Sequence, residues 1–213
     1  MFSSLTPKEM PVARIRFSVS ATLRASYGAE DFLQSISGKI LVRAEDRERE
    51  QEAGRITASL VQFGHARDHG ISAEEMGDGI SGSVAEYWEQ LFDMETDRWR
   101  AEIRDELEVC GSDLLIVDCI EIDPPFRGHQ IGLVAVDRTI EIFGRGCALV
   151  ACKPWPLQFT PAFMSNPRRM QRLKPPGADK EESLRRLRLY WARAGFWPLG
   201  QTGVYVMSMS QRR

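Results

Sequence analysis

Polar and apolar residues alternate in the first part of the chain, as they do in strands with one buried face. Residues 13–19, ARIRFSV, show this alternation, and residues 38–44 and 54–63 are two further strand-like runs. The charged segment between these two runs, EDREREQEA, predicts a solvated loop that joins an antiparallel hairpin. Residues 28–36 predict a short helix ahead of the hairpin. This part of the chain is therefore expected to form mainly antiparallel sheet.

Helical periodicity replaces the alternation further along. Between residues 83 and 108, apolar side chains recur at helical spacing and predict one or two helices. The stripe consists of Val84, Tyr87, Trp88, Leu91, Phe92, Trp99, Ile103 and Leu107. Large aromatic side chains contribute much of the buried area of a core, so we interpret this stripe as core rather than as the lining of a pocket.

The middle of the chain contains a strand, a turn, a helix and a second strand. Residues 112–122 are mostly apolar and predict a strand covered on both faces, which Pro124 and Pro125 end. Residues 131–144 have apolar positions in helical register, and residues 147–155 form another apolar run. This order favours two parallel strands joined by a right-handed crossover.

A basic, proline-containing stretch follows, and the chain ends with a predicted amphipathic helix, residues 181–196, and a predicted alternating strand, residues 202–209. The chain has 213 residues, of which 43% are hydrophobic, which is enough for one sizeable core. No internal repeat is visible. We therefore predict a single α/β domain with a central mixed, largely antiparallel sheet flanked by helices.

The balance of charge narrows the function classes. The chain has 28 Lys and Arg against 30 Asp and Glu, a formal net charge of -2. A general nucleic-acid binder carries a strong basic excess, which this chain lacks. The N-terminus has no basic start followed by an apolar core, and nowhere do 18 apolar residues follow one another. We expect a soluble cytoplasmic protein with no membrane partner.

The cysteines predict no metal centre and no disulfide framework. They show no CxxC spacing, and most lie in or beside apolar strand-like runs, where a buried reduced thiol is the common state. The four are Cys110, Cys119, Cys147 and Cys152.

The junction between the central strand and its helix reads IDPPFRGHQIG, residues 122–132. Such a turn exposes the unpaired N–H groups of the first helical turn, and glycine lets the backbone curl into a concave nest at the positive end of the helix dipole. The turn is therefore predicted to bind an anion. It matches neither G-x-G-x-x-G nor G-x-x-x-x-G-K-[ST], so another class of phosphate ligand is indicated. The alternative is a purely structural junction.

These residues resemble the GNAT superfamily of acyl-CoA-dependent N-acyltransferases. The family's motif, Arg/Gln-x-x-Gly-x-Gly/Ala at the start of a helix, is similar to Arg127-Gly128-His129-Gln130-Ile131-Gly132, and Ile120 to Pro124 resemble the strand end before it. The later segment LYWARAGFWPLG resembles the family's helix followed by Gly-Phe, here Gly195 and Phe196.

The resemblance implies a GNAT-like domain over residues 1–213, with insertions at about 64–113 and 153–182 that are expected to shape the acceptor pocket. It also implies an N-acetyltransferase that moves an acetyl group from acetyl-CoA to an amine by direct attack, with no covalent enzyme intermediate and no metal. The strand end would hold the pantetheine and the turn the pyrophosphate. The implied cofactor-binding residues are Ile120, Ile122, Arg127, Gly128, His129, Gln130, Ile131 and Gly132.

Two positions depart from the family's pattern. Gln130 stands where the motif has its first glycine, and a positive φ there would cost roughly 1–2 kcal/mol. Trp191 stands four residues before Gly195, where many members carry a tyrosine that protonates the leaving thiolate. Tyr190, about 100° around the helix, is the candidate catalytic acid instead. These departures motivate the alternative of a non-catalytic acyl-CoA-binding or interaction module on the same fold.

Glu121 is the candidate general base, because it lies on the strand just before the turn and could take a proton from the acceptor amine through water. The alternative is a strand carboxylate that faces outward. Asp118 ranks second, because it is expected nearer the middle of a buried strand. His65 and His69 have metal-ligand spacing, but no third ligand is evident, and a loop or surface role is the simpler interpretation.

Charge is unevenly distributed along the chain. Residues 74–123 contain sixteen Asp and Glu against three Lys and Arg, whereas residues 166–188 contain eight Lys and Arg against three Asp and Glu. The acidic segment, if it walls the acceptor entrance, would attract a cationic amine, and the basic segment would meet the coenzyme's phosphates. The alternative is that both are solvated faces. The further alternative of a nucleic-acid-binding module is supported by the basic segment alone.

Overall fold

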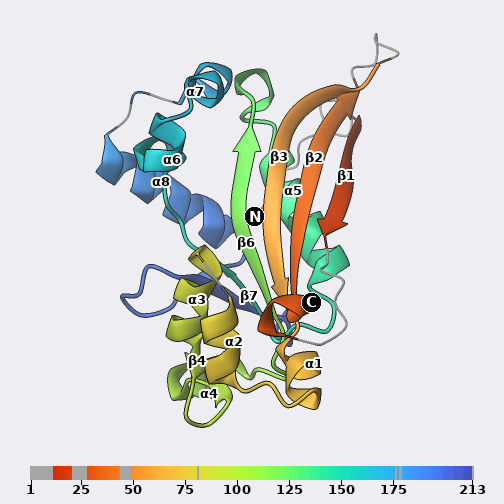
Figure 1. Ribbon diagram of the computed structural model, residues 1–213. Coiled ribbons are helices and arrows are strands. Elements are labelled where there is room, and N and C mark those ends of the chain that lie inside the picture. Colours follow the sequence, from red (N-terminus) through yellow and green to blue (C-terminus); the bar gives the residue numbers. More distant parts are fainter. Residues whose placement is uncertain are drawn as a thin grey trace.

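A seven-stranded mixed sheet runs through the molecule, in the strand order β1-β2-β3-β6-β7-β9-β8 (Figure 1). The computed structural model describes residues 12–20, 28–43, 49–80, 82–175, 177 and 179–212. Only β6 and β7 are parallel; the other neighbouring strands are antiparallel. The predicted fold class, an α/β protein with a mixed, largely antiparallel sheet flanked by helices, is confirmed.

The first strands confirm the alternating pattern and lengthen it. They are β1 (Val12–Ser20), β2 (Leu33–Arg43) and β3 (Gln51–Val61). The helix predicted over residues 28–36 is only the short 3-10 turn η1 (Ala29–Phe32), because Ile36, Gly38 and Ile40 form one buried face of β2 at a spacing of two. Residues 44–48 of the predicted loop lie outside the described residues.

The aromatic stripe over residues 83–108 forms two helices separated by a small hairpin. Trp88, Phe92 and Trp99 pack together, with the rings of Trp88 and Phe92 stacked at 3.8 Å, so the stripe is core, as predicted. Two preceding helices were not predicted. The elements are α1 (Phe63–Asp68), α2 (Ala73–Gly79), α3 (Ser83–Leu91), β4 (Phe92–Asp93), β5 (Arg98–Trp99) and α4 (Ala101–Leu107).

The predicted central unit is present, and its two strands are parallel. It consists of β6 (Leu114–Ile122), η2 (Pro124–Phe126), α5 (Ile131–Phe143) and β7 (Leu149–Cys152). The rest of the chain comprises η3 (Leu157–Phe159), α6 (Pro161–Met164), α7 (Pro167–Leu173), α8 (Lys180–Arg193), β8 (Trp197–Pro198) and β9 (Tyr205–Ser208).

The two faces of the sheet are covered differently. On one face, Leu115 and Val117 of β6 pack against α5 and α8. On the other face, Leu114 and Ile116 pack against the aromatic cluster of α1 to α4, which lies at the lower end of the sheet in Figure 1. Helix α7 lies near the upper end of the sheet in Figure 1, at the opposite end from the aromatic cluster. Among the described helices, none is long and apolar enough to cross a membrane.

Candidate functional site

The two parallel strands pair along only part of β6. The register runs from Leu114 opposite Leu149 to Val117 opposite Cys152, where β7 ends. Strand β6 continues to Ile122, still paired with β3 on its other edge. No described strand pairs with residues 118–122 on the side of β7. The edge of β6 beyond Val117 therefore opens onto a gap between two parallel strands.

A β-bulge lies where the two strands separate. Ala58 of β3 is opposite Val117, but the next residue back, Thr57, is opposite Cys119, so Asp118 is the extra residue. A bulge bends its strand and increases the local twist. On the other side of the gap, Pro154 and Pro156 follow β7, and proline lacks the N–H that a continued ladder needs. These features together explain why β6 and β7 part.

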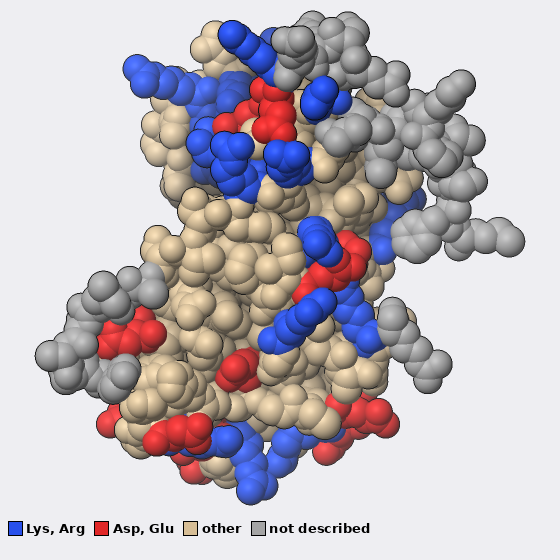
Figure 2. Space-filling model, turned by 90° about the vertical axis from the view of Figure 1, so that its right-hand side faces the viewer, with Lys and Arg blue, Asp and Glu red and all other residues tan. Residues whose placement is uncertain are grey.

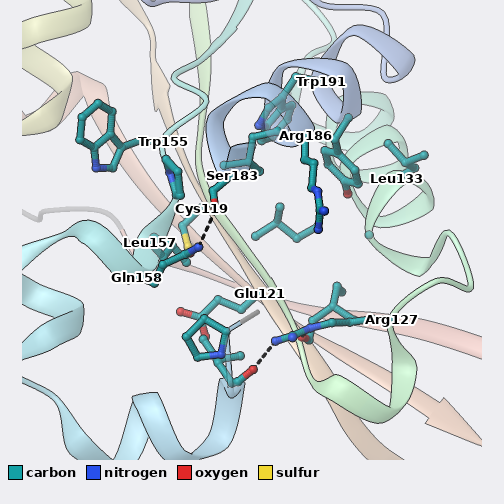
Figure 3. Close-up of a pocket in the computed structure, with 18 of the residues that line it drawn as sticks. Cys119, Glu121, Arg127, Leu133, Trp155, Leu157, Gln158, Ser183, Arg186 and Trp191 are labelled. Carbon is teal, nitrogen blue, oxygen red and sulfur yellow. Dashed lines mark hydrogen bonds between the residues drawn. The ribbon is translucent and has the colours of Figure 1, made fainter. Parts of the chain in front are cut away.

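A cleft of about 540 Å³ occupies this gap. Its walls are the end of β6, the turn into α5, the segment after β7 and one side of α8. Figure 3 shows Ser183, Arg186 and Trp191 of α8 on one side of the cleft and Glu121 and Arg127 on the other. We call this space the acyl cleft, after the acyl-CoA that the sequence resemblance predicts as a ligand.

The turn into α5 has the backbone conformation of a nest. Gly128 has φ 84°, and Gln130, the N-cap, has φ 57° and ψ 7°. Gln130 therefore adopts the left-handed conformation, the costly case for a residue other than glycine at this position. No side chain caps the helix, and its first main-chain bond runs from Val134 N to Gln130 O. The amides of residues 131–133 have no partner within the helix and lie at the end of the acyl cleft.

Arg127 fastens the turn to its surroundings. Its guanidinium donates to the carbonyl oxygens of Ile122, at 2.9 Å, Lys174 and Leu173. Three of its donors are therefore committed to the backbone, and its main effect on a ligand would be its charge. His129 is exposed. Arg186 of α8 also lines the acyl cleft, so the basic segment does reach this site.

Glu121 is buried, at 7% exposure, and its carboxylate is held by Arg169 and Arg172. Arg172 also pairs with Asp123. The simple alternative of an outward-facing carboxylate is therefore wrong. Both carboxylate oxygens of Glu121 accept from guanidinium groups and so are not free to face an acceptor amine, which makes Glu121 the weaker candidate for the base.

Asp118 has the properties that a general base requires. It lines the acyl cleft, and its Oδ2 accepts a hydrogen bond of 2.9 Å from Ser59. Its Oδ1 is buried and has no hydrogen-bond partner among the described residues. Burial raises the pKa of Asp118, partly offset by the bond from Ser59. The bulge therefore turns the second-ranked residue into the better candidate.

Tyr190 and Trp191 both line the acyl cleft, with ring centroids 5.7 Å apart, but they have different further contacts. The Tyr190 hydroxyl lies against the start of α5, where a Cβ on Gly132 would be 2.5 Å from it. Burial raises the pKa of Tyr190 far above its ordinary value, so its hydroxyl stays protonated. Trp191 is 5% exposed and packs edge-on against Phe196, with ring centroids 5.2 Å apart. The tryptophan is thus mostly buried in the core, although it also lines the acyl cleft.

A second pocket, of about 390 Å³, lies on the other side of β6 and shares Cys119 and Glu121 with the acyl cleft. We call it the basic pocket. Sequence reasoning noted the basic segment but not this pocket, because Arg55 comes from β3 and the other arginines from around α7. Its lining is Arg55, Thr57, Cys119, Glu121, Asn166, Arg168, Arg169 and Arg172. Figure 2 faces the side of the molecule that lies to the right in Figure 1, away from α7, and there too Lys and Arg gather around acidic side chains at the upper end.

The two predicted insertions differ in what they contribute. Residues 153–175 supply walls to both spaces, whereas residues 64–113 supply none to either. The acidic helices α2 to α4 lie at the opposite end of the sheet from α7 (Figure 1). His65 and His69 pack on each other, with ring centroids 4.7 Å apart, and no cluster of metal-ligand type occurs among the described residues.

No family model, curated protein or solved structure matches this chain. The resemblance to GNAT acyltransferases therefore stays a prediction from the residues quoted in the sequence analysis.

Proposed function

We propose that this protein is an acyl-CoA-dependent N-acyltransferase. The observation that carries the proposal is the separation of two parallel strands at a bulge, with the opened strand edge leading to an uncapped helix N-terminus. The first feature offers main-chain donors and acceptors to an extended amide-containing ligand. The second offers unpaired amides to a phosphate. Acyl-CoA combines these two chemical groups, an extended pantetheine and a pyrophosphate, in one molecule.

The ligand can be placed by these two anchors. The pyrophosphate would lie on the amides of residues 131–133, near the charges of Arg127 and Arg186. The pantetheine would run along β6 from Ile122 towards Asp118, a length of roughly 13 Å at the usual rise of a strand. The thioester is then expected near Asp118, where the two strands part.

The chemistry requires a nucleophilic amine and a proton acceptor. The amine nitrogen attacks the thioester carbonyl carbon, a C–N bond forms, and the C–S bond breaks. The proton from the nitrogen passes to Asp118, directly or through water, and the thiolate takes a proton from water. Holding amine and thioester together supplies much of the acceleration.

Cys119 does not provide a covalent route. Burial raises the pKa of its thiol to about 12, so the thiolate that would attack a thioester is scarce near neutral pH. This favours direct attack by the amine.

The proposed role of Tyr190 is to bind the coenzyme and not to protonate the leaving thiolate. Because its hydroxyl adjoins Gly132, we assign it to hydrogen bonding of the coenzyme at the turn, at the far end of the strand edge from Asp118.

The test is thermal unfolding with and without acetyl-CoA, in the wild type and in two matched variants. A ligand at 100 times its Kd stabilises the native state by about 2.7 kcal/mol. Gly128 has positive φ and nothing within 4 Å of an added Cβ, so Gly128→Asp and Gly128→Asn fit equally well and both tolerate this conformation. We expect the aspartate to weaken acetyl-CoA binding by about tenfold or more through repulsion of phosphate, and the asparagine to retain most of it.

The outcome that would overturn the proposal is a wild-type protein with no shift at millimolar acetyl-CoA. Equal binding by both variants would remove the turn from the phosphate site.

The second candidate is a non-catalytic acyl-CoA-binding module. The burial of Trp191 in the core, where many family members carry a catalytic tyrosine, favours it. Such a module would show the same thermal shift, but no acetyl transfer and no thiol release with any amine.

A further inference from the structure

The basic pocket has a composition that coenzyme binding does not explain. It is lined by four arginines and one glutamate. Arg169 and Arg172 pair with Glu121, and Arg55 pairs with Glu52. Arg168 has no ion-pair or hydrogen-bond partner among the described residues and is exposed. The pocket therefore holds positive charge that the protein's own carboxylates do not fully neutralise.

The pocket lies on the side of the sheet from which an acceptor would approach Asp118. Alternate residues of a strand share a face, so Arg55, Thr57 and Ser59 of β3 form one row. Arg55 and Thr57 line the basic pocket, and the hydroxyl of Ser59 binds Asp118. The row leads from the arginines to the base, and Cys119, opposite Thr57, lines both the pocket and the acyl cleft.

Glu121 holds two arginines of the basic pocket, Arg169 and Arg172, in place. Its carboxylate holds Arg169 through Nε, at 2.6 Å, and through Nη2, and it holds Arg172 through Nη2. This fixes two guanidinium groups, leaving Arg168 and Arg55 at the more exposed part of the pocket. Guanidinium groups bind carboxylate and phosphate through paired hydrogen bonds, and neutral or cationic groups gain nothing comparable.

We propose that the acceptor amine carries an anionic group, a carboxylate or a phosphate, and that the basic pocket binds this group. The inference rests on the proposed acyl transfer and names the class of its acceptor. It replaces the cationic acceptor that the acidic segment suggested, because residues 74–117 line neither space and the acidic helices lie at the other end of the sheet.

The test compares four small amines with acetyl-CoA by thiol release: 3-aminopropanoate, 2-aminoethyl phosphate, 3-aminopropanol and 1,3-diaminopropane. We expect kcat/KM for one or both anionic amines to exceed that of the alcohol and the diamine by about tenfold or more, the effect of one or two charge-assisted hydrogen bonds. The better anion identifies carboxylate or phosphate as the group. The preference should shrink at high salt, because part of the pocket is exposed.

The variant is Arg168→Gln, with Arg188→Gln as the matched control. Arg188 is exposed on α8, lines neither space and loses the same charge on substitution. We expect Arg168→Gln to lower kcat/KM for the anionic amines about fivefold through a higher KM, with 3-aminopropanol unchanged. Arg188→Gln should leave all four amines unchanged. Variants of Arg169 or Arg172 are unsuitable because they leave buried Glu121 unpaired.

The possible failures are distinguishable. Acetyl-CoA stabilisation with equal or faster transfer to the alcohol or the diamine, unaffected by Arg168→Gln, overturns this inference and leaves the acyltransferase in place. Absence of acetyl-CoA stabilisation in the wild type overturns the proposed function and this inference with it. Stabilisation by acetyl-CoA without transfer to any of the four amines overturns this inference and is also the result expected of the non-catalytic module, which a wider amine panel then tests.

Discussion

The two ends of β6 lie in opposite environments although they belong to one strand. At the lower end, Leu114 to Val117 are buried on both faces and paired on both edges. At the upper end, the strand loses one neighbour and carries Asp118 and Glu121. The change coincides with the bulge. Burying polar side chains requires partners or solvent, so the sheet opens where the sequence of β6 turns polar.

The closed end should be the source of stability, and the largest expected effect is Trp88→Ala. Trp88 is fully buried, stacks on Phe92, and donates to the carbonyl of Ala73 at 2.9 Å. We expect a loss of about 3–5 kcal/mol in the free energy of unfolding, measured with urea. The control, Trp197→Ala, removes a tryptophan that is 66% exposed and should change stability by about 0.5 kcal/mol or less. A similar loss in both variants would contradict the assignment of the core.

The open end should be the source of activity, and Asp118→Asn tests it. The asparagine can still accept the Ser59 bond but cannot take a proton, so we expect kcat to fall about 100-fold or more with acetyl-CoA affinity nearly unchanged. The control is Asp113→Asn, a carboxylate at the closed end whose pKa burial also raises. An active Asp118→Asn enzyme would return Glu121 to consideration as the base.

Tyr190→Phe tests whether the two ends of the acyl cleft have separate roles, coenzyme binding at the turn and chemistry at Asp118. If the hydroxyl binds coenzyme at the turn, its loss should weaken acetyl-CoA binding about five- to tenfold and leave kcat within about twofold. Isothermal titration gives the affinity, and saturating acetyl-CoA gives kcat. The reverse result, a lower kcat with unchanged affinity, would restore Tyr190 as the acid that protonates the thiolate.

The smallest expected effect is on the pH dependence of stability. Because the pKa of Asp118 is raised in the native state, the native state binds more protons between the ordinary carboxylate pKa of about 3.9 and the raised value. The contribution of Asp118 to stability is full below this window and is lost as pH rises through it. Asp118→Asn should therefore gain stability relative to the wild type as pH rises.

For Asp93, the expected change of stability with pH has the opposite sign, and the same experiment measures it. A hydrogen bond from Thr96 is the main cause of its lowered pKa, so its contribution is present above pH about 3.9 and is lost as pH falls through the lowered pKa. Asp93→Asn should lose stability relative to the wild type as pH rises. If unfolding at several pH values gives the same sign for both variants, one of the two pKa directions is wrong.

Local patterns predicted much of the fold. The spacing of apolar residues identified β1, β6, α5 and β7, and it placed Trp88 and Phe92 in the core. The hairpin β4–β5 was missed because Phe92 and Trp99 maintain an apparent helical stripe across it. The predicted helix over residues 28–36 was wrong beyond Phe32, because pairing with β3 along the whole of β2 outweighs a local helical tendency.

The candidate site was only partly predictable. The motif located the turn, because a turn depends on a few adjacent residues, whereas the positive φ of Gln130 was only a possibility that the motif raised. The sequence did not predict that Asp118 would be a better candidate for the general base than Glu121. Strict alternation of strand residues takes no account of a bulge, which here adds one residue and turns Asp118 towards Ser59.

The sequence by itself determined the strands β1, β6 and β7, the helix α5 and the turn between β6 and α5, because periodicity, proline and glycine act over a few residues. The tertiary structure decided where β6 parts from β7, and it brought Arg55 together with Arg168 across more than half the chain. Strand separation and charge clustering depend on which distant segments become neighbours, and short-range patterns carry no record of that.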